Sequence, residues 1–431
     1  MNPNETQQAI LYRLNMLFSH RRSSSSYYRG RLPEQPLQSL DDLHQAPVTS
    51  QNEFRAHLPP EGTGGLTGPL EATYAFASGG TTGHPKLVYY SALEFERSAA
   101  DVAYGLQAAG VRPGMVAANL MNAGNMWASF QMVNLVLEKC RCHILPIAAQ
   151  AGPEEALSFM RVLGAEVAIG IPSFMVSLAQ QAQKQGVTDL HLKIIATGGE
   201  HFLDQARAFV KPLLGVGQFV SAGYSSNETG PIGYQCSHCS GGLHHLFQEN
   251  CLIEVLDEET LLPTPLGETG KLVVTKLNNR LMPVIRYDIG DRGRMVGLAC
   301  PCGRTEPLFE LLGRSDDILN IGGYNVSPDH LASVLAKVPG LSPHFRMMAR
   351  NEGPLALLYV ECESVAPCSA DEAREWSALL QHELPEALAG IRTLLNLKSI
   401  AVPRFVVLQP GSIPRNPRTG KIRRVIDERH A

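Results

Sequence analysis

The pattern of hydrophobic and polar positions changes character three times along this chain of 431 residues. From about residue 72 to residue 213, short apolar runs alternate with longer segments of helical periodicity. The predicted strands lie at 72–76, 115–120, 143–147, 167–171 and 193–196. The predicted helices lie at 93–109, 125–138, 153–163, 173–184 and 202–213. This alternation is typical of βαβ units that build a parallel sheet.

The flanking segments have other patterns. Helical periodicity over residues 5–20 predicts an N-terminal helix. Residues 250–300 contain short alternating strands separated by turns, which is typical of antiparallel pairing. From about residue 316 a smaller α+β unit follows, with predicted strands at 355–361 and 404–408 and a helix at 370–382.

The predicted fold is therefore α/β, with a large N-terminal domain and a small mobile C-terminal α+β domain. The large domain, residues 1–315, combines mixed and parallel sheets flanked by helices with a β-rich subdomain. The small domain spans residues 316–431. A chain of this length exceeds the size at which a single hydrophobic core usually stops growing, so more than one domain is expected.

Composition excludes several classes of protein. The net charge is −4 and the sequence pI is near 6.4, which disfavours a nucleic-acid binder. The apolar stretch Leu135–Ile147 is interrupted by Glu138, Lys139 and Arg141, so no membrane span is expected there. The first residues lack a basic segment followed by an apolar one, and we expect a cytoplasmic protein without a secretory signal.

Two segments suited to phosphates lie far apart in the chain. Ser78-Gly-Gly-Thr-Thr-Gly83 supplies hydroxyls and unhindered backbone N–H groups, which form anion-binding concavities, and we expect the next helix to add its positive end. A Walker A loop requires lysine directly after the glycine, whereas His84 and Pro85 precede Lys86 here. Near the other end, Lys421 follows Gly420 in a basic turn. Such a separation predicts an active site that closes between two domains.

These two segments resemble the ATP loop and the C-terminal lysine motif of the acyl-adenylate-forming enzymes. The resemblance implies that Lys421 is catalytic, because it would reach both the attacking carboxylate and the α-phosphate. It also implies that ATP contacts the glycine-rich loop, whose residues would be Ser78, Gly79, Gly80, Thr81, Thr82, Gly83 and Lys86.

Tyr224-Ser-Ser-Asn-Glu-Thr-Gly230 resembles the second motif of that family. By this resemblance Tyr224 would stack on adenine, Asn227 would touch a phosphate and Glu228 would hold Mg²⁺. The sequence departs from the family pattern at Ser225 and Asn227. Gly198-Gly-Glu200 resembles the turn that borders the adenine pocket, which would involve Gly199 and Glu200.

Two further motifs complete the resemblance. Arg286-Tyr-Asp-Ile-Gly-Asp291 resembles the motif whose aspartate accepts both ribose hydroxyls, which assigns Asp291. In Gly313-Arg-Ser-Asp-Asp317, Arg314 would contact ribose or phosphate as a further catalytic residue, and Asp316 would be the hinge. Asn325, in Gly322-Gly-Tyr-Asn-Val326, would reach the site on a C-domain loop after rotation.

A cluster of cysteines and histidines suggests a metal. Cys236, His244, Cys300 and Cys302 supply one imidazole and three thiolates, a ligand set suited to a structural tetrahedral Zn²⁺. Cys239 and Cys251 are alternative thiolates, and His238 and His245 are alternative imidazoles. Free buried thiols are the competing interpretation.

The residues of these motifs and their order, over nearly the whole chain, resemble one branch of the family, the phenylacetate–CoA ligase type of aryl-CoA ligase. This resemblance implies that a carboxylate and Mg·ATP give an acyl-adenylate and pyrophosphate, after which the small domain rotates and coenzyme A takes the acyl group. Some members of this branch hold zinc at the Cys/His positions. The segment 121–130 is more polar than in phenylacetate enzymes and favours another aryl acid. The predicted pocket residues are Asn122, Trp127, Phe130 and Ser173, with Asn125 as an alternative to Asn122.

Three functions stay open at this point. The first is an ATP-dependent aryl-acid:CoA ligase, and the second is an adenylating enzyme that loads the phosphopantetheine thiol of a carrier protein. The third is a zinc-stabilised homologue without activity, which the intact Lys421, Asp291, Arg314 and Glu228 disfavour. The partners expected are a small aromatic acid, ATP and coenzyme A, with a carrier protein as an alternative acceptor. A homodimer is an option for the assembly.

Overall fold

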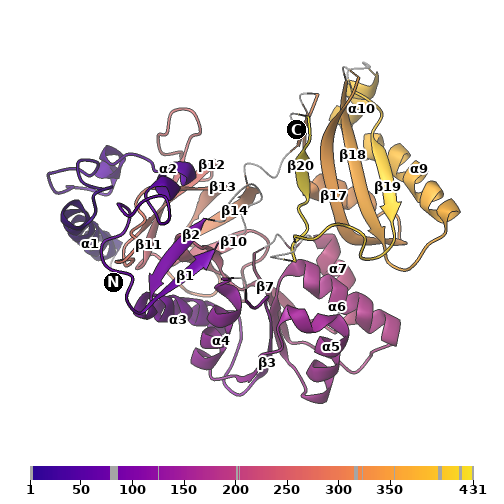
Figure 1. The fold of residues 1–431 in the computed structure, drawn as a ribbon, viewed down its shortest axis with the longest axis horizontal. Coiled ribbons are helices and arrows are strands. Elements are labelled where there is room, and N and C mark those ends of the chain that lie inside the picture. The colour runs from indigo at the N-terminus through magenta and orange to yellow at the C-terminus, as the bar shows by residue number, and fades with distance from the viewer. Residues whose placement is uncertain are drawn as a thin grey trace.

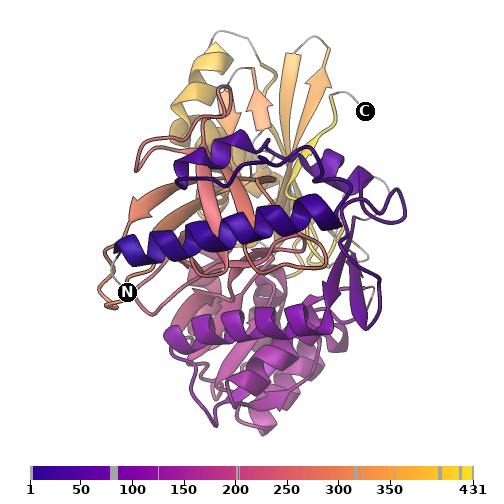
Figure 2. The same ribbon diagram turned by 90° about the vertical axis from the view of Figure 1, so that its left-hand side faces the viewer.

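A computed structural model describes residues 3–77, 86–124, 126–199, 202, 204–314, 319–322, 324–353, 355–396, 400–416 and 420–429. The N-terminal segment contains α1 (Pro3–Ser24), the short 3₁₀ helix η1 (Asp41–Gln45) and α2 (Gln51–Ala56). Leu14 and Phe18 of α1 belong to the same buried apolar cluster as Val255, Leu272 and Val274. Figure 2 accordingly shows α1 lying across the outer side of the large antiparallel sheet.

A two-stranded hairpin flanks the glycine-rich loop. β1 (Thr73–Ala77) pairs antiparallel with β2 (Leu87–Ser91), and α3 (Ala92–Ala108) begins only after β2. The helix predicted at 93–109 is confirmed, but a strand that was not predicted separates it from the loop. The run Leu87-Val-Tyr-Tyr90 is rich in β-branched and aromatic side chains, which favour a strand. The positive end of α3 thus lies one strand away from the loop.

A parallel sheet is confirmed, but its strands differ from the prediction in two places: the strand predicted at 72–76 belongs to the antiparallel hairpin, and a strand at 218–221 that was not predicted joins the sheet. Five strands lie in the order β4-β3-β5-β6-β7, and all their pairings are parallel. The strands are β3 (Val116–Leu120), β4 (His143–Leu145), β5 (Val167–Gly170), β6 (Ile194–Thr197) and β7 (Gln218–Ser221). The accompanying helices are α4 (Ser129–Lys139), the 3₁₀ helix η2 (Ala149–Ala151), α5 (Gly152–Val162), α6 (Pro172–Gln185) and α7 (Asp204–Leu213). Figure 1 shows these helices beside the sheet.

The β-rich region is also confirmed, as one sheet of seven strands in the order β11-β12-β13-β14-β10-β9-β8. All its pairings are antiparallel. Its strands are β8 (Tyr224–Ser226), β9 (Gly230–Tyr234), β10 (Leu243–Leu246), β11 (Cys251–Leu256), β12 (Gly270–Lys276), β13 (Tyr287–Gly297) and β14 (Leu308–Arg314).

The C-terminal unit begins with a hairpin of β15 (Leu319–Ile321) and β16 (Tyr324–Val326). A sheet of four strands follows in the order β19-β18-β17-β20. Its elements are α8 (Pro328–Leu335), β17 (Leu341–Glu352), β18 (Leu355–Ser364), α9 (Ala370–Ala387), α10 (Ala389–Asn396), β19 (Arg404–Leu408) and β20 (Val425–Asp427). The sequence analysis did not predict β17, the central strand that pairs with both β18 and β20.

The C-terminal unit packs against α6 and α7, as Figure 1 shows. One cluster of buried apolar side chains runs through both units: Leu178 and Val210 come from these helices, and Phe345 and Met347 come from β17. Burial of apolar surface therefore stabilises this relative orientation of the two units.

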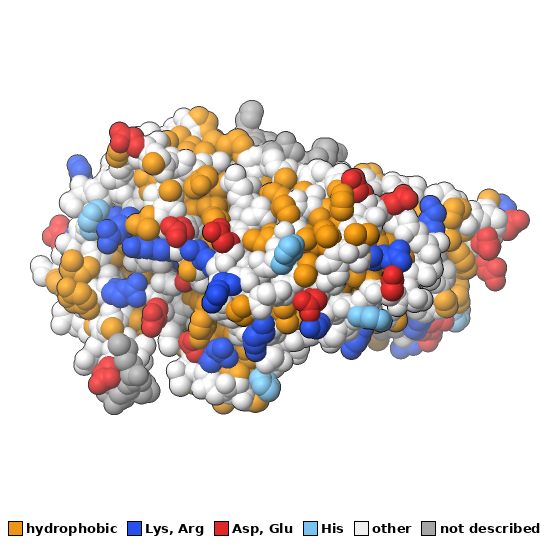
Figure 3. All heavy atoms as spheres, turned by 90° about the horizontal axis from the view of Figure 1, so that it is seen from below, with side chains coloured by type: hydrophobic (Ala, Val, Ile, Leu, Met, Phe, Trp, Pro, Cys, Tyr) orange, Lys and Arg blue, Asp and Glu red, His pale blue; other side chains and the backbone are white. Residues whose placement is uncertain are grey.

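On the face shown in Figure 3, Lys and Arg side chains lie interspersed with Asp and Glu side chains rather than forming a field of one sign. Among the helices that the structure describes, none combines the length and apolar character needed to cross a membrane.

Candidate active site

Lys421 reaches from the C-terminal unit to the end of the parallel sheet. Its Nζ donates a hydrogen bond to the carbonyl oxygen of Gly199, which follows β6. Gly199 has φ of +79°, and a Cβ there would lie 2.9 Å from the lysine Nζ. A side chain at position 199 would therefore collide with the lysine and strain the backbone.

The lysine also meets the segment predicted to bind the acid. Its Nζ lies 5.5 Å from the centroid of the Trp127 indole, within cation–π range. A Cβ on Gly420 would lie 3.4 Å from Nδ2 of Asn122, which places Asn122 beside the turn that carries the lysine. The structure thus brings Lys421 together with Gly199, Trp127 and Asn122, as expected for a site closed between two domains.

An aromatic cavity of about 390 Å³ opens beside Trp127. The predicted pocket residues Trp127 and Phe130 line it, but the wall also includes Tyr74 and Phe76 of β1, which the sequence analysis missed. Their i, i+2 spacing on a strand was the available signal, since such residues share one face. The complete lining is Tyr74, Ala75, Phe76, Gly124, Met126, Trp127, Phe130, Gln131 and Asn134.

Two other predicted pocket residues lie elsewhere. Asn122 and Ser173 are not part of the lining of this cavity. Ser173 is buried at the start of α6, and its carbonyl oxygen lies 3.3 Å from Nε2 of His344 in the C-terminal unit. The start of α6 therefore contacts the C-terminal unit rather than the cavity.

Glu228 is a buried, ionised carboxylate. Its Oε1 lies 2.5 Å from Nζ of Lys86 and accepts a 3.0 Å hydrogen bond from the hydroxyl of Tyr287. Burial raises the pKa of Glu228, but the charge of Lys86 and these hydrogen bonds outweigh burial, so the pKa is lowered. An ionised carboxylate is a ligand that Mg²⁺ prefers, so Glu228 fits the predicted role, with Lys86 as the neighbouring cation in this structure.

The predicted nucleotide residues of the antiparallel sheet lie together. The hydroxyl of Tyr224 donates a 2.6 Å hydrogen bond to Oδ2 of Asp291. The register of β13 and β14 pairs Asp291 directly with Arg314. Tyr224 is buried, and its ring centroid lies 5.6 Å from that of Phe309. At Asn227 the carbonyl oxygen accepts a 2.6 Å hydrogen bond from the hydroxyl of Tyr90.

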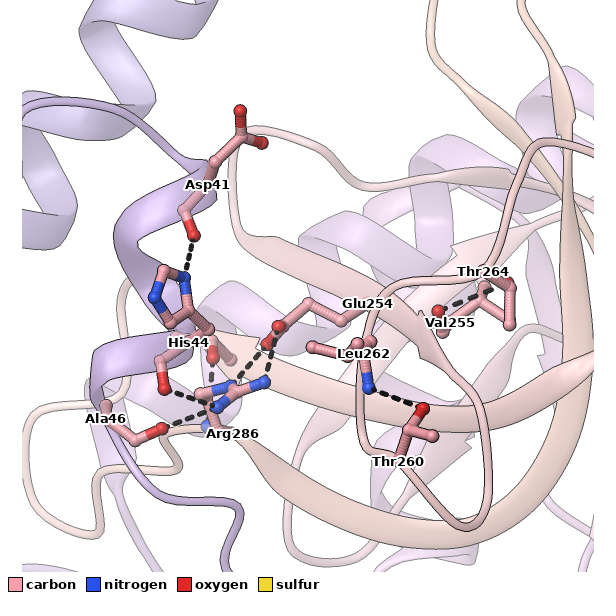
Figure 4. A network of polar contacts seen from close by, with 10 residues as sticks. Asp41, His44, Ala46, Glu254, Val255, Thr260, Leu262, Thr264 and Arg286 are labelled. Atoms are coloured by element: carbon pink, nitrogen blue, oxygen red, sulfur yellow. Dashed lines mark hydrogen bonds and ion pairs between the residues drawn. The ribbon is translucent and has the colours of Figure 1, made fainter.

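The arginine that opens the Asp291 motif is structural. Buried Arg286 binds both oxygens of Glu254 with Nε and Nη2, at 2.9 and 2.8 Å. Its Nη1 donates to the carbonyl oxygens of His44 and Ala46 (Figure 4). Arg286 therefore ties the N-terminal segment to the antiparallel sheet, while Tyr287 and Asp291 of the same motif face the site residues Glu228 and Tyr224.

Three cysteines and one histidine that could hold a metal ion come together, but the histidine is not the one predicted first. The thiols of Cys236, Cys300 and Cys302 and one imidazole nitrogen of His245 lie within 4.8 Å of one another. The Cys236 and Cys300 sulfurs are 3.6 Å apart, and the Cys302 sulfur is 3.4 Å from Nε2 of His245. Donors on a tetrahedron around Zn²⁺ lie roughly 3.5 to 3.8 Å apart, given the usual Zn–S and Zn–N distances. These four residues therefore fit a zinc ion.

The assignment of His244 as the ligand is corrected. Successive side chains of a strand point to opposite faces, and both histidines lie on β10. His244 instead packs against Tyr224 and Phe309, with its Nδ1 2.7 Å from the carbonyl oxygen of Gly242. Burial lowers the pKa of His244 to about 4, so its ring is neutral at pH 7. Nδ1 of His245 lies 3.4 Å from the carbonyl oxygen of Glu306. A hydrogen bond from Nδ1 to this oxygen would orient the ring and leave Nε2 to bind a metal ion.

Some predicted residues cannot be placed. Ser78, Gly79, Gly80, Thr81, Thr82, Gly83, Asn125, Glu200 and Asp316 lie outside the described residues. For Arg314 and Asn325 the structure describes the backbone, in β14 and β16. Their roles stay predictions.

Comparison with known proteins agrees with this architecture. Residues 39–280 match the family described as AMP-binding enzyme, and residues 323–429 match the AMP-binding enzyme C-terminal domain. The chain is 31% identical over 433 residues to the phenylacetate-coenzyme A ligase of Thermus thermophilus. The alignment covers 97% of this chain and 95% of that protein.

A solved structure has the same fold. 2-Hydroxyisobutyryl-CoA ligase in its postadenylation state, in complex with 2-HIB-AMP, matches with a TM-score of 0.83 and 23% identity, covering 100% of this chain and 91% of that one. For the thioesterification state of that ligase, with 24% identity and the same coverage, the TM-score is 0.68. Sequence and fold together show that this chain belongs to the AMP-binding enzymes, in their phenylacetate–CoA ligase-like branch, as an AMP-forming acid–thiol ligase.

Proposed function

We propose that this enzyme activates an aryl carboxylic acid with ATP and transfers the acyl group to the thiol of coenzyme A. The observation that carries the proposal is the cavity of about 390 Å³ with Tyr74, Phe76, Trp127 and Phe130 in its wall. Aromatic walls favour an aromatic ring through offset-stacked and edge-to-face contacts. Trp127 links this cavity to Lys421, which supports a substrate whose ring enters the cavity and whose carboxylate lies near the lysine.

Polar groups on the cavity wall favour an aryl acid that carries a polar group able to form hydrogen bonds. Gln131 and Asn134 belong to the lining. The indole Nε1 of Trp127 is buried without a hydrogen-bond partner in the part of the chain that the structure describes. Buried donors are normally satisfied, so an oxygen of the bound acid is a suitable acceptor for this N–H group.

In the first step, a carboxylate oxygen of the acid attacks the α-phosphorus of ATP, and the bond to the pyrophosphate oxygen breaks. Both reactants are anions, so Lys421 between them stabilises the transition state electrostatically. Tyr224 would stack on adenine, Asp291 would accept the ribose hydroxyls, and Lys86 and Asn227 would contact phosphates. Glu228 would hold Mg²⁺, which supplies neutralising charge at the phosphates when bound.

In the second step, the thiolate of coenzyme A attacks the acyl carbonyl carbon and AMP leaves. We assign residues 1–315 and 316–431 as the two domains, with Asp316 as the hinge, so that rotation removes Lys421 and brings Asn325 to the site. Arg314 would contact the ribose or phosphate. The zinc ion expected at Cys236, His245, Cys300 and Cys302 would join β9, β10 and the turn before β14 rather than act on the substrate.

The test is acid-dependent release of pyrophosphate from Mg·ATP, measured across a panel of aryl and aliphatic acids with and without coenzyme A. Continuous release that requires both an aryl acid and coenzyme A is the expected result. Stoichiometric release that coenzyme A does not change would assign a carrier-protein thiol as acceptor instead. Release with short aliphatic acids alone would contradict the aryl substrate.

The variant Phe130→Ala separates the cavity from the nucleotide site. It removes a ring from the wall, so we expect the KM for the aryl acid to rise at least about tenfold while the KM for ATP changes less than about twofold. Phe159→Ala, which removes an exposed ring on α5, is the matched control. Equal effects of the two variants on the KM for the acid would refute the cavity as the acyl site.

A further inference from the structure

A buried pair of polar side chains in the C-terminal unit belongs to none of the sites above. His344 of β17 and Glu363 of β18 are each 1% exposed. Nδ1 of His344 lies 3.2 Å from Oε2 of Glu363. Buried groups of this kind are costly unless they are fully paired, so their partners indicate what the pair does.

One partner belongs to the other domain. Nε2 of His344 lies 3.3 Å from the backbone carbonyl oxygen of Ser173, 171 residues earlier in the chain. A carbonyl oxygen can only accept a hydrogen bond, so Nε2 carries the proton and donates it. Ser173 lies in the first turn of α6. Ile171, directly before that helix, lies near the lysine turn: a Cβ on Gly420 would lie 4.0 Å from Cδ1 of Ile171.

The remaining partners belong to the segment that leads to Lys421. Oε1 of Glu363 accepts a 2.8 Å hydrogen bond from the backbone N–H of Ile413. Arg415, two residues later, lies beside the pair, with its Nη2 3.3 Å from Nδ1 of His344; because Nδ1 donates to Glu363, this is proximity and not a hydrogen bond. Arg415 forms a β-bridge with Ile422, and the N–H of Asn416 donates a 2.8 Å hydrogen bond to the carbonyl oxygen of Lys421. A continuous set of contacts therefore connects α6 of the large domain, through His344 and Glu363, to the turn that carries the lysine.

Only one of these contacts depends on how the two domains are arranged. Burial raises the pKa of Glu363, but the hydrogen bonds from His344 and from the Ile413 N–H outweigh burial and lower it. The carboxylate is therefore ionised. Its bonds to His344 and Ile413 lie within the small domain, whereas the bond from His344 to Ser173 crosses to the large domain. Rotation of the small domain would break the bond across the interface and leave the internal ones intact.

We propose that His344 and Glu363 are positioning residues that hold the small domain and its lysine turn in the orientation for adenylate formation. They act through Lys421 and do not touch the reactants. This inference rests on the two-step reaction proposed above. It predicts that disrupting the pair slows the adenylation step and spares thioester formation, which uses the other orientation.

Separate variants test the bond from His344 to Ser173 and the bond between Glu363 and Ile413. His344→Asn keeps an amide near the Nδ1 position, facing Glu363, but is too short to reach Ser173. His344→Gln places an amide near the Nε2 position and can donate to Ser173, so it serves as the conservative variant. Glu363→Ala removes the anchor of Ile413. Glu361→Ala is its matched control, because Glu361 forms a similar cross-strand pair with Arg346, at 2.5 Å on the same two strands.

Two half-reactions are measured with the acid that the panel identifies: acid-dependent ATP–pyrophosphate exchange, and thioester formation from the preformed acyl-adenylate and coenzyme A. We expect His344→Asn and Glu363→Ala to slow exchange about 10- to 100-fold, the size expected for a lost hydrogen bond to a charged group. Thioester formation should change less than about twofold. His344→Gln should recover most of the exchange rate, and Glu361→Ala should resemble the wild type.

Equal losses in both half-reactions, or equal effects of Glu363→Ala and Glu361→Ala, would overturn the proposal. Hydrogen–deuterium exchange of the unliganded protein supplies a readout independent of activity. The backbone amides of residues 409–416 should exchange their hydrogens faster in Glu363→Ala than in wild type or Glu361→Ala. An unchanged rate of hydrogen exchange in Glu363→Ala would also overturn the proposal. Absence of ATP–pyrophosphate exchange in the wild type would refute the proposed function instead, while the amide measurement still tests the anchor.

Discussion

Nζ of Lys421 lies 5.5 Å from the centroid of the Trp127 indole, although the two residues are 294 positions apart in the chain and come from different domains. The same amine donates to the carbonyl oxygen of Gly199. The indole face and the carbonyl both attract a cation, so this position favours the charged lysine. It places the ammonium group between the aromatic cavity and the edge of the parallel sheet.

Replacing this lysine should affect one half-reaction. We expect Lys421→Ala to slow adenylate formation about 100- to 1,000-fold, because it removes the cation between two anionic reactants. Thioester formation from preformed adenylate should persist. Arg423→Ala, which removes an exposed cation two residues away, is the control and should leave both rates within about twofold. Equal loss of both steps in Lys421→Ala would remove the assigned role.

The hydrogen bond from Tyr224 to Asp291 gives a second prediction. Tyr224→Phe leaves the ring but removes a 2.6 Å contact to the carboxylate, so Asp291 becomes less well oriented for the ribose. We expect the KM for ATP to rise about 3- to 10-fold with little change in kcat, since ground-state and transition-state binding are affected alike. Asp291→Ala should raise it further.

Steady-state kinetics with varied ATP checks this prediction. Tyr104→Phe is the control, because its hydroxyl contacts Glu306 near the metal cluster at 3.2 Å. An unchanged KM for ATP in both Tyr224→Phe and Asp291→Ala would place the nucleotide elsewhere.

Adjacent histidines provide a sharp test of the metal site. Purified protein should contain about one zinc per chain. His245→Ala should lose the metal and lower the unfolding temperature by several degrees, because structural zinc contributes directly to folding. His244→Ala should keep the metal even if it is less stable, because that ring packs on the other face of β10. Metal analysis of both variants decides this, and zinc retained by His245→Ala would contradict the assignment.

Asp101 should make stability depend on pH. Burial raises its pKa to about 6, although the charge of Lys276 and the hydrogen bond from Asn250 oppose this. The folded protein therefore binds a proton more tightly than the unfolded chain, and this stabilisation is fully present below about pH 4 and is lost as the pH rises through 6. Asp101→Asn, which is uncharged at every pH, should be more stable than wild type at pH 7.5 by about 1–3 kcal/mol.

Urea unfolding of both proteins at pH 5 and pH 7.5 measures this difference. The difference in the free energy of unfolding between Asp101→Asn and wild type should be larger at pH 7.5 than at pH 5. Asp189→Asn, at an exposed carboxylate bound by Arg161, is the control and should show no such gain at high pH. If the free energies of unfolding of wild type and Asp101→Asn differ by the same amount at both pH values, the carboxyl group of Asp101 does not titrate in this range.

Much of the fold followed from local patterns. The alternation of apolar runs and helical segments predicted the parallel sheet, because each strand and helix there is encoded by contiguous residues. The hairpin strand β2 and the central strand β17 escaped prediction. Leu87–Ser91 is short and follows a glycine-rich loop, and β17 carries polar His344 and Arg346 at positions that only its partner strands explain.

The sequence alone determined the family, the order of its motifs and the chemical groups available for the reaction, since these depend only on which residues follow one another. The tertiary structure decided which of those groups meet. It selected His245 over His244 because neighbouring residues of a strand face opposite sides. It also joined Lys421 to Gly199, Tyr224 to Asp291, and Ser173 to His344. Contacts between residues so far apart in the sequence arise from the packing of sheets and domains, and no local pattern of residues predicts them.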